Sequence, residues 1–460
     1  MSKVFVFCIG GTGLRVMKSI TMLMAGGMDT NGYTVIPIIL DPHLDLEERG
    51  NLGLLIENYK DIRNRINNGP NARLDPLPGF FYSEIGNLSG DTGVAPAVGA
   101  GERFGTYISR ANLQADDLNN RLVETMFSTK NLNSPLSVGF KGNPNVGTVV
   151  LGNIIESANW FQNLGAQCEQ DDRIFIISSI FGGTGASGYP LLEKKIRLAE
   201  NHPALRNAIM GAVTVLPYYA LTDPSPTGSD IDSASFYTKA KAALTYYAGT
   251  VESDYLYYVG DQRLHQTYDN DETRQDDKAH FIELVAASAL FDFLKRERPD
   301  TQQFLRRAIE DDTDTLDLTS LGSGYKDIVK STADYLLLRH LLGLLPKEKH
   351  FPLSATRGFN ESFYEDNAFN QLRQFTELYY QWYTELAQNR RAFTPINTEA
   401  TKHMSSWIKG LTLEAKDDSY YLLSMIKASN KEGNMHDNKF RYFLKFAFDA
   451  INNYTNKINQ

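Results

Sequence analysis

Two glycine-rich turns carry the residues of this 460-residue chain that are best suited to bind a ligand. Residues 10–13 read Gly-Gly-Thr-Gly, and residues 182–188 read Gly-Gly-Thr-Gly-Ala-Ser-Gly. Glycines let a backbone approach a ligand closely, and a helix that begins at such a turn offers free N–H groups and a partial positive charge. Both turns therefore predict contacts with phosphate oxygens.

Both turns follow short apolar runs, and the elements around them predict how they are placed. Apolar runs of strand character alternate with helical stretches such as 191–199 and 234–248, which predicts an α/β fold with a mainly parallel sheet. In such sheets, ligands bind outside the carboxyl ends of the strands, where both turns lie. The predicted strands are residues 3–9, 33–40, 173–180, 208–216 and 255–259. After about residue 345, long aromatic segments at 369–389 and 440–458 predict a helical C-terminal region.

Composition excludes several classes of protein. The formal charge of -9 argues against non-specific binding to nucleic acid or to an anionic membrane, so we expect no direct nucleic-acid partner. The two cysteines are far apart, so a disulfide framework is not expected and a cytoplasmic location is the default. The N-terminal apolar run is too short for a signal peptide, and no apolar run approaches the roughly 20 residues of a membrane span.

Other interpretations of the two turns were weighed against phosphate binding. The first turn resembles a dinucleotide-binding turn, with Asp41 at the end of the next strand as a ribose ligand, but the third glycine of GxGxxG would fall on Val16. It could equally be a tight strand–helix turn. The second turn is no nucleophile elbow for Ser187, because GxSxG is absent, and the chain contains no GxxxxGK[ST].

The second turn, with Pro190 and the helical residues 191–197 after it, resembles the tubulin signature GGGTGSG and its following helix. The chain is therefore similar to the tubulin/FtsZ superfamily, and it is most similar to the divergent bacterial tubulin-like branch. The resemblance implies a Rossmann-like GTP-binding domain over residues 1–300 that includes a long central helix. A connecting region over 301–345 and a divergent helical region over 346–460 would follow.

The resemblance also implies GTP or GDP with Mg²⁺ as ligands. Asp41 would act on the metal directly or through water, and Asp261 stands where FtsZ has the Asn of IPNDRL, which reads the base. A carboxylate there could accept hydrogen bonds from guanine N1–H and N2–H, which adenine does not offer. His280 or Phe281 would stack on the base, and Asp232 falls in the ribose-binding segment. The full set of implied nucleotide contacts is Gly10, Gly11, Thr12, Gly13, Asp41, Gly99, Ala100, Gly101, Gly182, Gly183, Thr184, Gly185, Ala186, Ser187, Asp232, Asp261, His280 and Phe281.

The chain departs from the family where one subunit completes its neighbour's hydrolytic site. Residues 295–300 lack the family's acidic pattern, and the nearest substitute is Asp317, which suits a turn or cap better than catalysis. Phe236 stands in place of the arginine of the ribose loop. We therefore expect nucleotide binding with weak or absent GTP hydrolysis, and nucleotide-controlled self-association or docking of a protein partner.

Two alternatives remain open. The chain could be a non-enzymatic nucleotide-binding scaffold in a bacterial multiprotein system, for which the family suggests antiphage defence or membrane remodelling. It could instead be a Rossmann-type NAD(P) oxidoreductase, although that interpretation leaves the second glycine turn unexplained.

Overall fold

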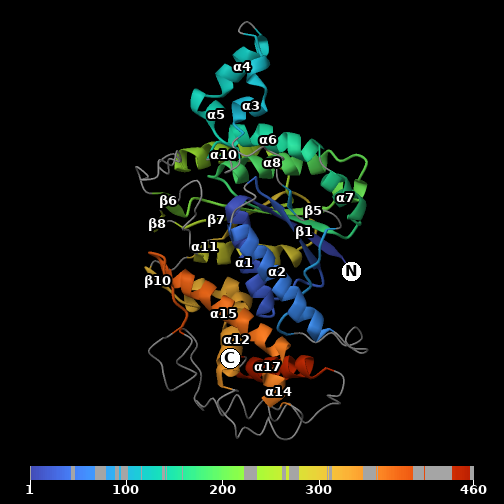
Figure 1. Ribbon diagram of the computed structural model, residues 1–460, viewed down its shortest axis with the longest axis vertical. Coiled ribbons are helices and arrows are strands. Elements are labelled where there is room, and N and C mark those ends of the chain that lie inside the picture. The colour runs from blue at the N-terminus through green and yellow to red at the C-terminus, as the bar shows by residue number, and fades with distance from the viewer. Residues whose placement is uncertain are drawn as a thin grey trace.

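The computed structural model places a seven-stranded parallel sheet at the centre of the molecule (Figure 1). It describes residues 2–42, 47–67, 79–88, 93–94, 102–114, 117–136, 140, 142–157, 159–221, 236–261, 266–268, 279–307, 309, 313–344, 359, 361–396, 409 and 438–455. The strand order is β3-β2-β1-β4-β5-β7-β9. The strands are β1 (Lys3–Ile9), β2 (Thr34–Leu40), β3 (Gly93–Val94), β4 (Arg173–Ser179), β5 (Ile209–Val215), β7 (Tyr255–Val259) and β9 (Gln303–Arg307).

The predicted α/β fold and its five predicted strands are confirmed. The edge strand β9 was not predicted, because its sequence Gln-Phe-Leu-Arg-Arg is too polar to indicate a buried strand. Two short parallel pairs were also missed, namely β6 (Tyr219–Leu221) with β8 (Gln266–Tyr268) and β10 (Thr315–Leu316) with β11 (Ala392–Phe393). Strands of two or three residues are too short for a hydrophobic pattern to reveal them.

Strand β1 shows why the sheet lies between two layers of helices. Val4, Val6 and Cys8 belong to one hydrophobic cluster, and the residues between them belong to the other. Successive side chains of a strand point to opposite faces, so a strand covered on both faces must be apolar throughout. The helices are α1 (Gly10–Ala25), α2 (Glu47–Ile66), α6 (Pro144–Ser157), α7 (Asn159–Gln167), α8 (Gly183–Arg197), α9 (Pro203–Arg206), α10 (Phe236–Thr250) and α11 (Phe281–Leu294).

The two faces of the sheet carry different helices (Figure 1). Helices α1, α2 and α11 contribute to the cluster on one face, and α6, α7, α8 and α10 contribute to the cluster on the other. Helix α11 is buried at every position except Asp292. A helix that is apolar on all sides lies inside a protein, and here α11 packs against α1 and the sheet.

A helical C-terminal region, predicted from the sequence, is confirmed in the described residues. It contains α12 (Lys326–Leu344), α14 (Glu361–Tyr364), α15 (Asn367–Ala387) and α17 (Lys439–Thr455). It packs directly on the sheet-containing part of the chain, since Ser331 of α12 donates a 3.0 Å hydrogen bond to the carbonyl of Leu23 in α1. The residue limits 1–300, 301–345 and 346–460 for separate domains stay a prediction.

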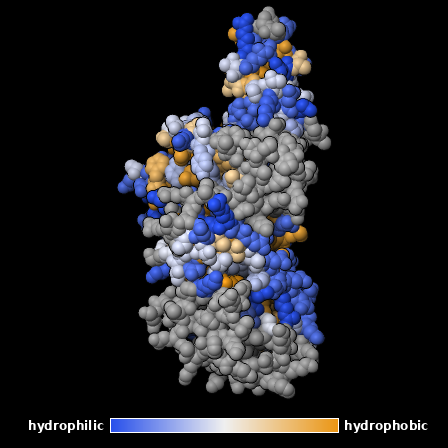
Figure 2. All heavy atoms as spheres, turned by 90° about the vertical axis from the view of Figure 1, so that its left-hand side faces the viewer, coloured by the Kyte–Doolittle hydropathy of each residue, from blue (hydrophilic) through white to orange (hydrophobic). Residues whose placement is uncertain are grey.

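A helical arm projects from the end of the molecule opposite the C-terminal helices (Figure 1). It is built from α3 (Phe104–Tyr107), α4 (Leu118–Met126) and α5 (Thr129–Asn133), and Figure 2 shows apolar atoms on its surface. Leu118, Leu122 and Met126 of α4 are its large exposed apolar residues. Within the described residues, no helix is both long and apolar enough to cross a membrane.

Candidate functional site

The two glycine turns lie side by side at the point where the strand order of the sheet reverses. Strand β1 leads into α1, and its neighbour β4 leads into α8. From this pair the sheet continues to β2 and β3 on one side and to β5, β7 and β9 on the other. Such a reversal opens a crevice outside the carboxyl ends of the strands, which is where open α/β sheets bind ligands.

The two turns come close together at Gly10. Gly10 has a φ of +69°, and a Cβ added there would lie 3.4 Å from Thr184 Cβ and 3.8 Å from the Gly185 nitrogen. The positive φ would strain any residue with a side chain at this position, and its Cβ would be in ordinary van der Waals contact with the second turn. The sequence predicted that both turns hold the phosphates of one nucleotide, and the structure places the turns next to each other. We define residues 10–13 and 182–185 as the cradle.

The cradle has the donors that a phosphate group requires. Helices α1 and α8 both begin in it, with Ile9 and Gly182 as N-caps. Neither N-cap makes a side-chain hydrogen bond in the described structure, and neither first turn contains an acidic residue. Gly11 and Thr184 are partly exposed, as is Gly182. Backbone N–H groups at the starts of two helices therefore face a site that favours an anion.

Other glycines of the cradle serve close packing. A Cβ on Gly13 would fall 2.6 Å from the carbonyl carbon of Cys8, and one on Gly185 would fall 2.5 Å from the Ser179 oxygen. Both clashes are with backbone atoms, which cannot move aside as a side chain can. Gly13 and Gly185 therefore let each helix start tightly against the strand before it.

Asp41 lies at the same edge of the sheet. Ile9 pairs with Leu40, so Asp41 is at the level of Gly10 across the β1–β2 pair. Its side chain is 4% exposed. One carboxylate together with phosphate oxygens suits Mg²⁺, which usually keeps several waters and takes few protein ligands. Within the described residues, no group of three or more His, Cys, Asp or Glu side chains forms a metal cluster.

Some of the predicted nucleotide contacts are buried or hydrogen-bonded within the protein, and others lie outside the described residues. Ser187 Oγ donates a 2.7 Å hydrogen bond to the carbonyl of Gly183, so the hydroxyl proton is used within α8 and is not offered to a ligand. Thr12 within the cradle and Ala186 just after it are buried. The predicted contacts Gly99, Ala100, Gly101 and Asp232 lie outside the described residues.

Asp261 follows β7 at the same edge of the sheet, but its carboxylate is engaged by the protein. It forms an ion pair with Arg391, and both side chains are 5% exposed. Arg391 also donates from Nε to the carbonyl of Thr313 at 3.1 Å, and its guanidinium lies 5.5 Å from the centre of the Phe281 ring. Asp261 thus connects the end of β7 to the segment that follows α15.

The predicted stacking residues lie at the start of α11 and are buried. His280 is the N-cap of α11, where Nδ1 accepts a 3.1 Å hydrogen bond from the Ile282 nitrogen. Its ring lies 5.2 Å from the ring of Tyr218 and 4.7 Å from that of Phe281. His280 and Phe281 are 2% and 0% exposed, so stacking on a base would require a shift of α11.

A buried ion pair beside the cradle was not foreseen. Arg15 donates from Nε to Glu283 Oε1 at 2.8 Å and from Nη2 to the Tyr218 hydroxyl at 2.9 Å, and that hydroxyl donates to Glu283 Oε1 at 2.8 Å. Arg15 is 6% exposed and Glu283 is 1% exposed. The available signal was Glu283 itself, an acid within an apolar helix, because a buried charge needs a partner.

Asp317, the catalytic candidate from the sequence, caps a turn. Its Oδ1 accepts hydrogen bonds from the Thr319 nitrogen at 2.8 Å, from Thr319 Oγ1 at 2.5 Å and from the Ser320 nitrogen at 3.3 Å. This arrangement matches the turn or cap interpretation of the sequence. Its part in hydrolysis stays a prediction.

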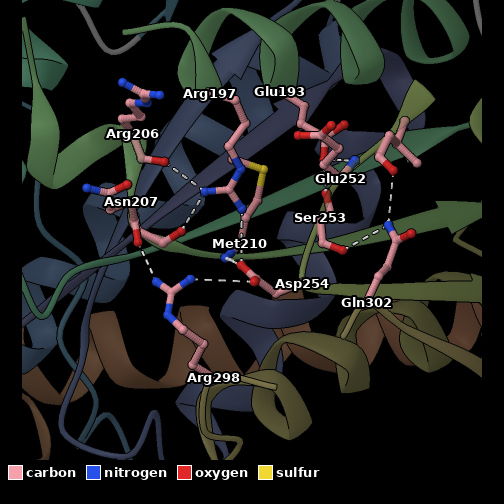
Figure 3. Close-up of polar contacts among 12 residues, drawn as sticks. Glu193, Arg197, Arg206, Asn207, Met210, Glu252, Ser253, Asp254, Arg298 and Gln302 are labelled. Carbon is pink, nitrogen blue, oxygen red and sulfur yellow. Dashed lines mark hydrogen bonds and ion pairs between the residues drawn. The ribbon is translucent and has the colours of Figure 1, made fainter. Parts of the chain in front are cut away.

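A second polar cluster lies at the opposite end of α8 from the cradle (Figure 3). Glu193 is 2% exposed and accepts hydrogen bonds from Ser253 Oγ at 2.5 Å and from the Glu252 nitrogen at 3.0 Å. Arg197 pairs with Asp254 at 3.1 Å. Burial raises the pKa of Glu193 to about 7, although these hydrogen bonds oppose the shift. The cluster joins α8 to the amino-terminal side of β7, so we assign it a structural role.

Replacing Glu193 with glutamine should remove a pH dependence of stability. The pKa of Glu193 lies at about 7 in the folded protein, above its ordinary value of 4.5. The folded state therefore holds more protons between these values, and the free energy of unfolding should fall by about 3 kcal/mol as the pH rises through that window. Urea unfolding from pH 4.5 to 7.5 should show this fall in the unmodified protein and a flatter profile in the variant. Glu200→Gln, an exposed control just after α8, should leave the profile unchanged; equal slopes in all three proteins would contradict the assignment.

Comparisons with known proteins give limited likenesses. No family model matches the chain, and no curated protein matches it. Among solved structures, it is similar to CetZ from Methanosaeta thermophila, with 16% identity and a TM-score of 0.30 over 72% of this chain and 60% of that one. CetZ2 from Haloferax volcanii, in a GTPγS-bound protofilament, has 12% identity and a TM-score of 0.30 over 64% and 56% of the chains. An empty FtsZ dimer from M. jannaschii has 14% identity and a TM-score of 0.28 over 64% and 53%. The match spans less than two thirds of each of these chains, and at such scores we base the functional proposal on the residues of this chain.

Proposed function

We propose that this protein binds a guanine nucleotide, and that the nucleotide controls its self-association or its docking to a protein partner. The observation that carries the proposal is the close approach of the two turns, since a Cβ added to Gly10 would be in van der Waals contact with Thr184, and this places the starts of α1 and α8 in one phosphate cradle. A dinucleotide-binding turn uses a single helix start, so it would leave the second turn without a role. Two helix starts suit a di- or triphosphate.

Individual roles follow from the position of each group. The backbone N–H groups of Gly11, Gly182 and Thr184 would donate to phosphate oxygens, because these residues are partly exposed. Asp41 would hold Mg²⁺ directly or through water. Guanine is favoured by the residue type at position 261, where a carboxylate matches two guanine donors, but the Arg391 contact would have to open for Asp261 to reach the base.

Hydrolysis has less support than binding. Asp317 lies in the segment that best substitutes for the family's acidic loop, and its Oδ1 already accepts three hydrogen bonds. We therefore propose slow or absent turnover by the isolated chain. If a neighbouring copy completes the site, turnover per chain will rise steeply with protein concentration; a rate that is flat and near zero will favour a scaffold.

The first experiment is to denature the purified protein and identify any released nucleotide by chromatography. The emptied protein is then titrated with GTP, ATP and NAD, each with and without Mg²⁺. We expect guanine nucleotide to be released or to bind most tightly, with Mg²⁺ strengthening the binding of GTP. Binding of NAD with no guanine preference would replace the proposal with the oxidoreductase alternative, and no binding of any of them would leave a scaffold.

A further inference from the structure

We propose that a cavity between α1, α2, α15 and the start of α11 binds a compact, uncharged ligand that has an apolar body and one hydrogen-bond acceptor. The cavity has a volume of about 430 Å³. Small-molecule sites in proteins usually measure about 300–1,000 Å³ and combine an apolar lining with a few polar groups. This site is separate from the phosphate cradle, and the inference does not depend on nucleotide binding.

The walls of the cavity are mainly apolar. Leu14 and Met22 of α1 face Leu55 of α2 across it, and these three residues are buried in the protein. Leu54 of α2 and Leu378 of α15 also line it and are 67% and 39% exposed. Because two exposed leucines accompany a buried apolar interior, we place the mouth of the cavity at Leu54 and Leu378.

The charged groups of the lining pair with one another, and this balance indicates an uncharged ligand. Arg15 is 2.8 Å from Glu283, and both side chains are almost fully buried. Lys18 is 3.5 Å from Glu385, and both of these side chains are about one-third exposed. The lining thus holds two cations and two anions in pairs. A charged ligand would have to compete with one pair and would leave a charge behind in an apolar setting.

The acceptor on the ligand is indicated by Trp382. This residue of α15 is fully buried and lines the cavity. Its Nε1–H finds no hydrogen-bond partner among the residues that the structure describes. Buried indole N–H groups usually have a partner, and an unpaired one destabilises its surroundings. A carbonyl or ether oxygen on a bound molecule would supply the missing acceptor once a small rotation of the Trp382 side chain opens this fully covered N–H to the cavity.

The test uses the uncharged fluorophore prodan, a naphthalene with a ketone oxygen whose emission moves to shorter wavelength outside water. Prodan is titrated into the full-length protein. Leu54→Trp should block the mouth at little cost to folding because Leu54 is exposed, and we expect it to weaken binding at least roughly tenfold. The matched control is Leu118→Trp on the projecting arm, where the leucine is 79% exposed and lines no part of the cavity. This control should bind prodan as the unmodified protein does.

Two further variants define the site. Trp382→Phe removes the indole N–H and should weaken prodan roughly three- to tenfold while leaving competition by naphthalene, which has no acceptor, unchanged. Gly182→Asp alters the phosphate cradle and should leave prodan binding intact. The inference fails if prodan does not bind saturably, or if Leu54→Trp and Leu118→Trp change its binding equally. It also fails if Trp382→Phe weakens naphthalene as much as prodan. Loss of prodan binding in Gly182→Asp would place the probe in the cradle and would likewise contradict the inference.

Discussion

Replacing Gly182 with aspartate is expected to lower guanine-nucleotide affinity by roughly 100- to 1,000-fold without destabilising the fold. Gly182 is the N-cap of α8, with φ -83° and ψ 164°, a conformation that any residue adopts. An aspartate there would cap the helix, which stabilises it by a few tenths of a kcal/mol relative to glycine. The same carboxylate would lie where we place a phosphate, and two like charges about 4 Å apart repel by about 4 kcal/mol near a protein surface.

Gly182→Asn is the matched control. Asparagine has nearly the same size and also caps helices, but it carries no charge. Both substitutions place a Cβ 3.0 Å from Ser179 Oγ, so any steric effect is shared. Calorimetric titration with GTP gives the affinity, and circular dichroism gives the melting temperature. Equal affinities of the two variants would show that no phosphate lies at the start of α8. Gly183 is a poorer choice, because its Cβ would fall 2.8 Å from Phe140 Cβ and disturb the packing.

Removing either member of the Asp261–Arg391 pair should lower the free energy of unfolding by about 3–5 kcal/mol. Both side chains are 5% exposed, so each single substitution leaves a buried charge without its partner. We expect Asp261→Leu and Arg391→Leu each to show this loss in urea unfolding. The free energy of unfolding of the double variant should be at least as high as that of the less stable single variant, because the double variant leaves no uncompensated charge. Losses that simply add would mean that the pair is not coupled.

The same pair tests whether Asp261 reads the base. Asp261→Asn keeps a hydrogen-bond acceptor beside Arg391 but removes the charge, and folded protein is compared for binding of GTP and of ITP, which lacks the 2-amino group. We expect Asp261→Asn to lose its preference for GTP over ITP, because in the proposed site the Asp261 carboxylate leaves Arg391 and accepts from guanine N1–H and N2–H. An unchanged preference in a fully stable variant would show instead that the carboxylate stays on Arg391 and that Asp261 does not read guanine.

Most of the fold could be predicted from the local sequence. The five apolar runs correspond to β1, β2, β4, β5 and β7, because a strand covered on both faces must be apolar along its whole length. The long helices α15 and α17 were recognisable because their apolar and aromatic residues extend over many turns. The edge strand β9 was missed because its residues alternate between intermediate and exposed positions and so lack that continuous signal.

The candidate site also has parts that the sequence revealed and parts that it did not. Gly10–Gly13 and Gly182–Gly185 were recognisable in the sequence because a run of glycines at a strand–helix junction is a local pattern that needs no distant partner, and their phosphate contacts stay a prediction. The partners of charged residues were not predictable. Arg15 and Glu283 are 268 positions apart, and Asp261 and Arg391 are 130 apart. An ion pair requires the two side chains to meet in space, and nothing in the local pattern of either residue specifies the other.

The sequence by itself thus determined the class of fold, the two glycine turns and the expectation of a phosphate ligand, because each depends on residue types over a few consecutive positions. Only the tertiary structure decided that Gly10 lies next to Thr184, that Asp261 is paired with Arg391, and that a cavity lies between α1 and α15. These features arise where segments distant in the chain pack together. Their geometry is set by the order of strands in the sheet and by the way the C-terminal helices close over α1 and α2, so no single segment contains it.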